Sequence, residues 1–180
     1  MAFKSRYRGS SSIESPEALF YDLRNRNVEG LLAHQADVLR EYNSESADKP
    51  EVAMELPTGS GKTLIGLLVG EWRRRQLQER VVYLCPTRQL VHQVVDEAKS
   101  KFGINTLAFT GSQREYNPKA KAEYNQGEAM AVTTYRGTAN KTRKTHAKEI
   151  FNIRGTLWPR NSGYIRFLMD FTSVCSEVVP

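Results

Sequence analysis

Residues 51–63 read EVAMELPTGSGKT. The apolar run Val52–Leu56 predicts a buried strand, and the small residues that follow it predict a tight turn. Lys62 and Thr63 then open an apolar segment, LIGLLVGEW, which predicts a helix. A strand, a glycine-rich turn and a helix in this order form the setting of a phosphate-binding loop.

The turn contains the residue types that a bound phosphate requires. Gly59 and Gly61 let the backbone approach a phosphate, and N–H groups at a helix start carry partial positive charge. Lys62 would reach the β- and γ-phosphates, and the Thr63 hydroxyl would ligate Mg²⁺. Leu56 stands where the strict pattern has glycine, and a Gly/Ser turn before a helix that begins with lysine is the alternative. The predicted phosphate-binding residues are Pro57, Thr58, Gly59, Ser60, Gly61, Lys62 and Thr63.

Length and composition fit one soluble α/β domain. The chain has 180 residues, 39% hydrophobic and 26% charged, and no apolar run approaches the roughly 18 residues of a membrane span. The N-terminal stretch MAFKSRYRGSSS lacks the apolar segment of a secretory signal. Cys85 and Cys175 show neither metal-ligand spacing nor a disulfide framework. These features predict a cytoplasmic protein with no membrane partner.

The positive charge of the chain is concentrated in its last third. Residues 131–180 contain eight Lys or Arg against three Asp or Glu, which gives this segment +5 of the net +6. Such a bias predicts a polyanionic partner such as nucleic acid. A solvated basic surface without a partner is the alternative.

Alternating strands and helices predict an α/β fold with a parallel sheet covered by helices on both faces. Upstream of the phosphate loop, helices are expected from Ser15-Pro16 and over Leu31–Tyr42, with a surface loop at Ser44–Pro50. Downstream, further strands are predicted at Val81–Cys85, Ile104–Phe109, Ala129–Thr133 and Ile165–Met169, with helices beginning near Arg88 and at Pro118. Turns at the carboxyl ends of parallel strands should meet at one edge of the sheet, where ligands bind.

Several short motifs, in this order, resemble the N-terminal RecA-like domain of superfamily-two helicases of the DEAD/DEAH class. The branch of type III restriction and DNA-repair helicases is the most similar, and the resemblance covers roughly residues 15–138. The motifs are HQADVL at His34–Leu39, LPTGSGKT at Leu56–Thr63, CPTRQLV at Cys85–Val91, FTGS at Phe109–Ser112 and VTTY at Val132–Tyr135. The resemblance implies a P-loop NTPase that uses ATP and Mg²⁺, with Lys62 and Thr63 as its catalytic residues.

The resemblance also implies contacts beyond the phosphates. Gln35 would pair with the adenine edge, and an amide that caps a nearby backbone group is its alternative role. A nucleic-acid backbone would lie along the carboxyl edge of the sheet, with DNA favoured over RNA. For the turn after Cys85, a surface arginine on an ordinary strand-to-helix turn is the alternative. The residues implied in backbone contacts are Thr87, Arg88, Thr110, Gly111, Thr133 and Thr134.

A working member of this family needs an Asp-Glu pair after a further strand, to hold Mg²⁺ and to orient the attacking water. The one adjacent Asp-Glu after Thr63 is Asp96-Glu97, inside a predicted helix. The stand-in for the Mg²⁺ position is Asp170, which is followed by Phe171. The second RecA-like domain is absent too, so the resemblance implies a truncated member with little turnover, unless a partner chain supplies that domain.

These inferences divide the chain into a disordered segment at 1–14, a partial RecA-like domain at 15–138, and an irregular basic tail at 139–180 that is native or non-homologous. Two other functions fit parts of the sequence. A basic module could hold nucleic acid without using a nucleotide, or the loop could belong to a small-molecule kinase. Nucleic-acid affinity that is the same with and without ATP would favour the binding module. Phosphorylation of a small acceptor molecule would favour the kinase.

Overall fold

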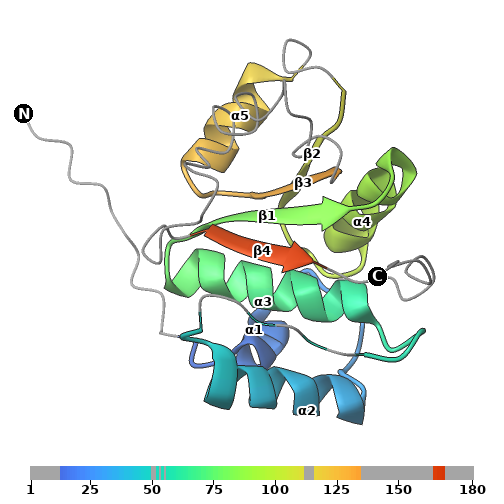
Figure 1. Ribbon diagram of the computed structural model, residues 1–180, viewed down its shortest axis with the longest axis vertical. Helices are drawn as coiled ribbons and strands as arrows, with labels where there is room; N and C mark the ends of the chain where they lie inside the picture. Colours follow the sequence, from blue (N-terminus) through green and yellow to red (C-terminus); the bar gives the residue numbers. More distant parts are fainter. Residues whose placement is uncertain are drawn as a thin grey trace, which may run out of the picture.

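Four parallel strands form the sheet of this protein, in the order β2-β3-β1-β4 (Figure 1). The computed structural model describes residues 13–49, 52, 54, 56–111 and 116–134, and residues 164–168 as strand backbone. The strands are β1 (Arg80–Cys85), β2 (Thr106–Phe109), β3 (Met130–Thr134) and β4 (Tyr164–Leu168). Each begins or ends within two residues of a predicted strand, so the predicted α/β class is confirmed.

The register brings the carboxyl ends of the strands together. Cys85 pairs with Thr134, and Phe109 pairs with Thr133. On its other side β1 pairs with β4, with Leu84 opposite Leu168. Because all pairings are parallel, the turns that leave these strands emerge at one edge, as the alternation of elements predicted.

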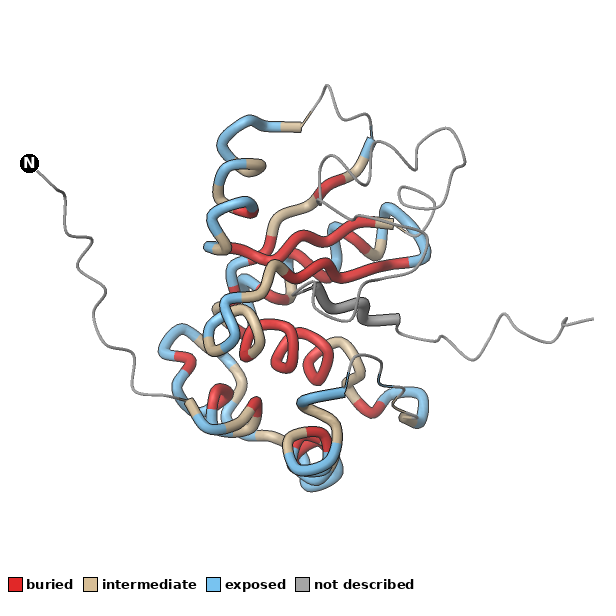
Figure 2. The backbone as a smooth tube through the Cα atoms, turned by 60° about the vertical axis from the view of Figure 1, so that its left-hand side comes forward, coloured by how far each residue is buried: buried red, intermediate tan, exposed pale blue. Residues whose placement is uncertain are grey.

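Helices cover both faces of the sheet. Helices α3 (Lys62–Gln76) and α4 (Arg88–Ser100) pack on one face, where alternate strand residues such as Val81 and Tyr83 join the larger apolar core. Helix α5 (Pro118–Asn125) covers the other face with Tyr124 against Val82. Figure 2 shows the buried strands and the middle of α3 as continuous buried segments.

A second helical layer lies on the far side of α3 from the sheet (Figure 1). It consists of α1 (Pro16–Asp22), α2 (Ala33–Glu41) and the π-helical turn η1 (Tyr42–Ser46). The predicted start of α1 is confirmed, since the Ser15 hydroxyl accepts a hydrogen bond from the Ala18 N–H at 3.0 Å. The loop predicted at Ser44–Pro50 begins later than expected, because the helical winding continues through Ser46, and residues 47–49 are non-helical as predicted.

The strand predicted at Val52–Leu56 is not found in the residues that the structure describes there. Val52, Met54 and Leu56 have no regular secondary structure, and Val52 is 37% exposed; Glu51, Ala53 and Glu55 lie outside the described residues. Met54 and Leu56 still pack against the apolar core, which accounts for two of the apolar residues in this run. Since β1 already has a neighbour on each side, this segment could pair only at an outer edge of the sheet.

Some predictions fall outside the described residues. They are residues 1–12 of the segment predicted to be disordered at 1–14, and the tail at 139–180 except for strand β4. Ile13, in the same predicted segment, is ordered: its carbonyl accepts a hydrogen bond from Trp72 Nε1 at 2.8 Å, and its side chain packs against the apolar core. Within the described part of the chain, every helix is too short or too polar to cross a membrane.

A buried carboxylate fixes the far end of α3. Glu71 is 1% exposed and accepts hydrogen bonds from Arg74 at 2.7 and 2.8 Å and from Arg75 at 2.7 Å. Arg74 also donates to the Gly127 carbonyl at 2.6 Å, which ties α3 to the turn before β3. The neighbouring Arg73 forms an ion pair with Glu79 at 2.8 Å. The arginines at this end of α3 are therefore held in ion pairs and are not simply solvated.

Replacing Glu71 with alanine should lower the free energy of unfolding by about 3 kcal/mol, because two guanidinium groups lose their buried partner. Urea denaturation measures the change. Glu97→Ala is the matched control, since Glu97 pairs with Lys101 at 3.1 Å on the surface and its loss should cost less than about 1 kcal/mol. Equal losses in the two variants would contradict the structural role of Glu71.

Candidate functional site

The predicted phosphate loop is a tight turn that leads directly into α3. Gly59 and Gly61 have φ values of 81° and 80°, in the left-handed region that favours glycine. The Ser60 N–H donates to the Pro57 carbonyl at 3.3 Å. Gly61 is the N-cap of α3 and no side chain caps this end, so the first N–H groups of the helix have no side-chain acceptor. The loop therefore presents unsatisfied donors at the positive end of a helix dipole.

The Ser60 hydroxyl is a second unsatisfied donor in the loop. Ser60 is 6% exposed, and within the described part of the chain its Oγ has no hydrogen-bond partner. A buried hydroxyl without a partner costs about 1–3 kcal/mol. An anion seated in the loop would satisfy this group together with the N–H groups of the helix start, so the residues present fit a phosphate.

Helix α2 braces the loop from outside. Gln35 Nε2 donates to the Ser60 carbonyl at 2.9 Å, and His34 Nε2 lies 3.0 Å from the same oxygen. A Cβ on Gly61 would collide with Gln35 Nε2, so a side chain there would displace the Gln35 amide from its hydrogen bonds, in addition to straining φ. The sequence indicated a role for Gln35 but not for His34, although the two are adjacent in HQADVL.

The amide of Gln35 is engaged by backbone groups at both ends. Its Oε1 accepts from the Leu32 N–H at 3.1 Å while its Nε2 holds the Ser60 carbonyl. This is the backbone-capping role given above as the alternative to adenine recognition. An amide has two donors and two acceptor lone pairs, so one of each is still unused by these contacts.

The loop reaches the carboxyl edge of the sheet at the end of β1. A cavity of about 30 Å³ is lined by Thr63 together with Cys85 and Pro86. Burial raises the pKa of the Cys85 thiol to about 12, which keeps it protonated and unreactive at neutral pH. Thr63 therefore lies beside the turn that was predicted to hold nucleic acid.

The residues predicted to contact a nucleic-acid backbone lie at or just after the carboxyl ends of the neighbouring strands β1, β2 and β3. Thr87 and Arg88 are exposed after β1, and the Thr87 hydroxyl caps α4 by accepting from the Leu90 N–H at 3.2 Å. Gly111, exposed with φ 92°, follows Thr110 after β2.

The remaining two residues end β3. Thr133 is 3% exposed, and its hydroxyl donates to the Phe109 carbonyl at 2.7 Å. Thr134 is half-buried. Thr134 is therefore partly open to solvent, whereas Thr133 is buried and its hydroxyl is hydrogen-bonded to the adjacent strand.

The acidic residues considered for Mg²⁺ are not assembled in the described part of the chain. Asp96 and Glu97 lie in the second half of α4, where Glu97 pairs with Lys101. Asp170 lies outside the described residues, as does Ser112 of the FTGS motif. No group of three potential metal ligands occurs among the described side chains, so Thr63 is the one predicted Mg²⁺ ligand whose surroundings are known.

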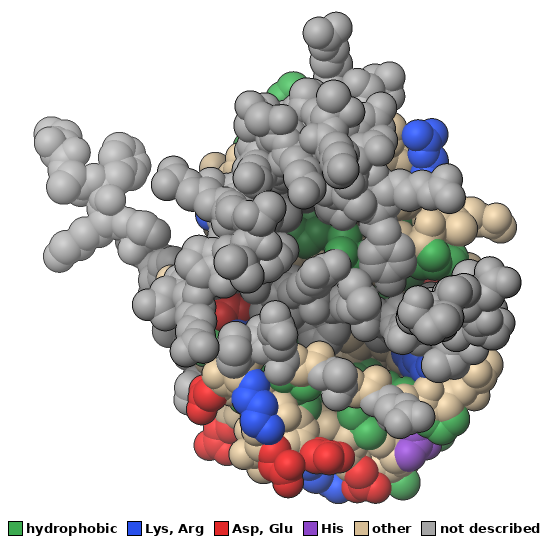
Figure 3. Space-filling model, viewed as in Figure 1, with side chains coloured by type: hydrophobic (Ala, Val, Ile, Leu, Met, Phe, Trp, Pro, Cys, Tyr) green, Lys and Arg blue, Asp and Glu red, His purple; other side chains and the backbone are tan. Residues whose placement is uncertain are grey.

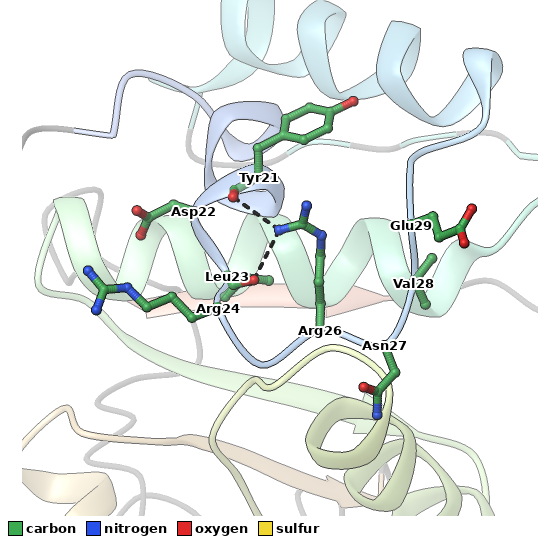
Figure 4. A pocket seen from close by; sticks show the side chains of 8 residues that line it. All are labelled: Tyr21, Asp22, Leu23, Arg24, Arg26, Asn27, Val28 and Glu29. Carbon is green, nitrogen blue, oxygen red and sulfur yellow. Dashed lines mark hydrogen bonds between the residues drawn. The ribbon is translucent and has the colours of Figure 1, made fainter.

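An open depression of about 480 Å³ lies away from the loop, in the connection between α1 and α2 (Figure 4). Its lining includes Arg26, whose Nη1 donates to the carbonyls of Tyr21 and Leu23, both at 3.0 Å. The guanidinium also stacks on the Phe20 ring at 5.0 Å. Arg26 therefore caps the end of α1, and the depression has no convergent set of donors for a phosphate.

The visible surface over α2 carries charges of both signs (Figure 3). Arg40 pairs there with Glu17 at 2.6 Å and with Asp37 at 3.1 Å. This face is therefore not a positive surface of the kind that binds polyanions. The basic excess of the sequence lies in residues 131–180, most of which are outside the described residues.

We expect substitutions at Gly61 and Gln35 to have coupled effects on the free energy of unfolding. Gly61→Ala should lower the free energy of unfolding by roughly 1–2 kcal/mol more than Gly59→Ala, because both glycines have the same φ but only Gly61 faces a side chain. In a double-mutant cycle, Gln35→Ala should remove most of that difference. Equal destabilisation by the two glycine substitutions would contradict the contact.

Comparison with known protein families matches residues 33–153 to the DEAD/DEAH box helicase. Comparison with curated proteins gives no match. The matched range includes the bracing helix α2, the phosphate loop and strands β1 to β3, which together form the edge described above. The chain therefore belongs to the DEAD/DEAH box helicase family, and the matched residues correspond to a helicase N-terminal domain.

Proposed function

We propose that this chain binds MgATP at Pro57–Thr63 and holds a nucleic-acid backbone along the adjacent carboxyl edge of its sheet. Family membership supports an ATP-dependent function of helicase type. The observation that carries the finer proposal is the loop itself, with its two left-handed glycines and uncapped helix start beside a buried, unpartnered Ser60 hydroxyl.

Each residue of the loop has a task in this proposal. Bound MgATP supplies the phosphoanhydride bond and the cation that offsets its charge. Lys62, at the first position of α3, supplies a positive charge to the β- and γ-phosphates, and Thr63 supplies an oxygen ligand to Mg²⁺. The N–H groups around Gly61 donate to phosphate oxygens. Asp170 is proposed as a further Mg²⁺ ligand because it follows β4, the strand beside β1.

Base recognition would use Gln35. Its amide keeps one donor and one lone pair beyond the contacts with Leu32 and Ser60, which is the number that pairing with the adenine N6 and N7 requires. A single side chain would then touch the loop and the base. This arrangement would link recognition of adenine to the position of the phosphates.

Nucleic acid would be held by backbone contacts that read no sequence. The exposed Arg88 begins α4, whose N-terminus offers N–H groups to a phosphate. Thr110, Gly111 and Thr134 would extend the contact along the ends of the neighbouring strands. We propose DNA as the polymer, following the branch of the family that the motifs resemble.

Substitution of Lys62 by alanine should weaken binding of a fluorescent ATP analogue with Mg²⁺ by about tenfold or more, because a charge-assisted contact to the phosphates is lost. Lys119→Ala, on the exposed side of α5, is the control and should bind like the native chain. Equal binding of the ATP analogue by the native chain and the Lys62 variant would overturn the proposal. Nucleic-acid affinity that changes neither on addition of ATP nor on substitution of Lys62 would favour the basic binding module.

Arg88→Ala should weaken single-stranded DNA binding and reduce the slope of log K against log salt by about 0.7, the value for one lost phosphate contact. Fluorescence anisotropy across a salt series measures this slope. Lys99→Ala removes an exposed charge from the last turn of the same helix and should leave the slope unchanged. An unchanged slope in the Arg88 variant would place the nucleic acid elsewhere.

A further inference from the structure

Two adjacent side chains of α2 converge on one carbonyl oxygen of the phosphate loop. Gln35 Nε2 lies 2.9 Å and His34 Nε2 lies 3.0 Å from the Ser60 oxygen. A carbonyl can only accept, so the His34 Nε2 must carry the hydrogen and donate it. The two donors use both lone pairs of this oxygen, so its direction is fixed from the side of α2.

The direction of this carbonyl decides where the next N–H points. The Ser60 carbonyl and the Gly61 N–H belong to one planar trans peptide, so they face opposite ways. With the oxygen directed at α2, the Gly61 N–H is directed away from α2. A flipped peptide would exchange the two and would present an oxygen, in place of a donor, to an anion bound on that side.

The loop needs such a brace because its own residues do not prevent the flip. A peptide flip changes ψ of Ser60 and φ of Gly61, and glycine adopts both signs of φ with little steric penalty. The Gln35 amide is itself oriented by the Leu32 N–H at 3.1 Å, so its NH₂ group must face the loop. His34 is exposed, and its one side-chain hydrogen bond among the described residues is with the Ser60 carbonyl.

We propose that His34 is a positioning residue of the phosphate loop, which with Gln35 keeps the Gly61 N–H available to a phosphate oxygen. This inference rests on the proposed function of the loop. It differs from base recognition, because a brace on the peptide acts on any ligand that places phosphate in the loop. His34 should therefore contribute equally to binding of ATP and of a polyphosphate that has no base.

The test measures dissociation constants by calorimetry for MgATP and for magnesium tripolyphosphate. His34→Ala should weaken both ligands by the same factor, on the order of 3- to 10-fold, as expected for one lost hydrogen bond. His34→Gln retains an N–H donor and should recover most of the affinity. His92→Ala removes another exposed histidine, from α4, and should bind both ligands like the native chain.

The outcomes separate this inference from the proposal beneath it. Loss of ATP affinity alone in His34→Ala would mean contact with the base or ribose and would overturn the inference, as would unchanged binding of both ligands. Equal losses in His34→Ala and His34→Gln would also overturn it, because the donor would not be the active feature. If the native chain binds neither ligand in a Lys62-dependent way, the proposed function fails, and the inference fails with it.

Discussion

Burial of α3 between the sheet and the second helical layer is the constraint on which the rest of the structure depends. Residues 64–72 of this helix are buried without interruption, and Glu71 among them is held by Arg74 and Arg75. A helix that is enclosed on all sides cannot shift along its axis without breaking packing on two faces. Its first turn is therefore fixed in space, and with it the phosphate loop that ends at Gly61.

The loop adds a second constraint, which acts on the direction of its backbone groups. Helix α3 fixes where the loop ends, while α2 fixes how the Ser60–Gly61 peptide is turned. Both contacts from α2 come from its first turn, so the two helical layers meet at the loop. If the loop binds a phosphate as proposed, its donors would be in place before the ligand arrives, and little reorganisation would accompany binding.

Much of this fold could be predicted from local pattern. Strands β1 to β3 and helix α4 follow from apolar runs and spacing, and the start of α1 follows from Ser15-Pro16. At the described positions Val52, Met54 and Leu56 the predicted strand is absent, and the apolar side chains of Met54 and Leu56 pack against the core instead. A local sequence pattern does not determine which segments pair with other strands in the sheet.

The candidate site shows the same division. The glycines, Lys62 and Thr63 could be proposed from the sequence because a phosphate requires those residue types in that order, and the structure places them together at the start of α3. The hydrogen bond from His34 to the Ser60 carbonyl could not be predicted, since the two residues are far apart in the sequence and their contact depends on how α2 packs. The ion pairs of Arg74 and Arg75 could not be predicted from the sequence either, because a run of like charges gives no sign of the buried carboxylate that holds them.

A crystal structure of the chain with Mg²⁺ and a slowly hydrolysed ATP analogue tests the central claim most directly. The account predicts phosphates against the N–H groups of Gly59–Thr63, with the Ser60 carbonyl still accepting from His34 and Gln35. A nucleotide seated elsewhere, or a Ser60–Gly61 peptide turned so that its oxygen faces the phosphates, would contradict it.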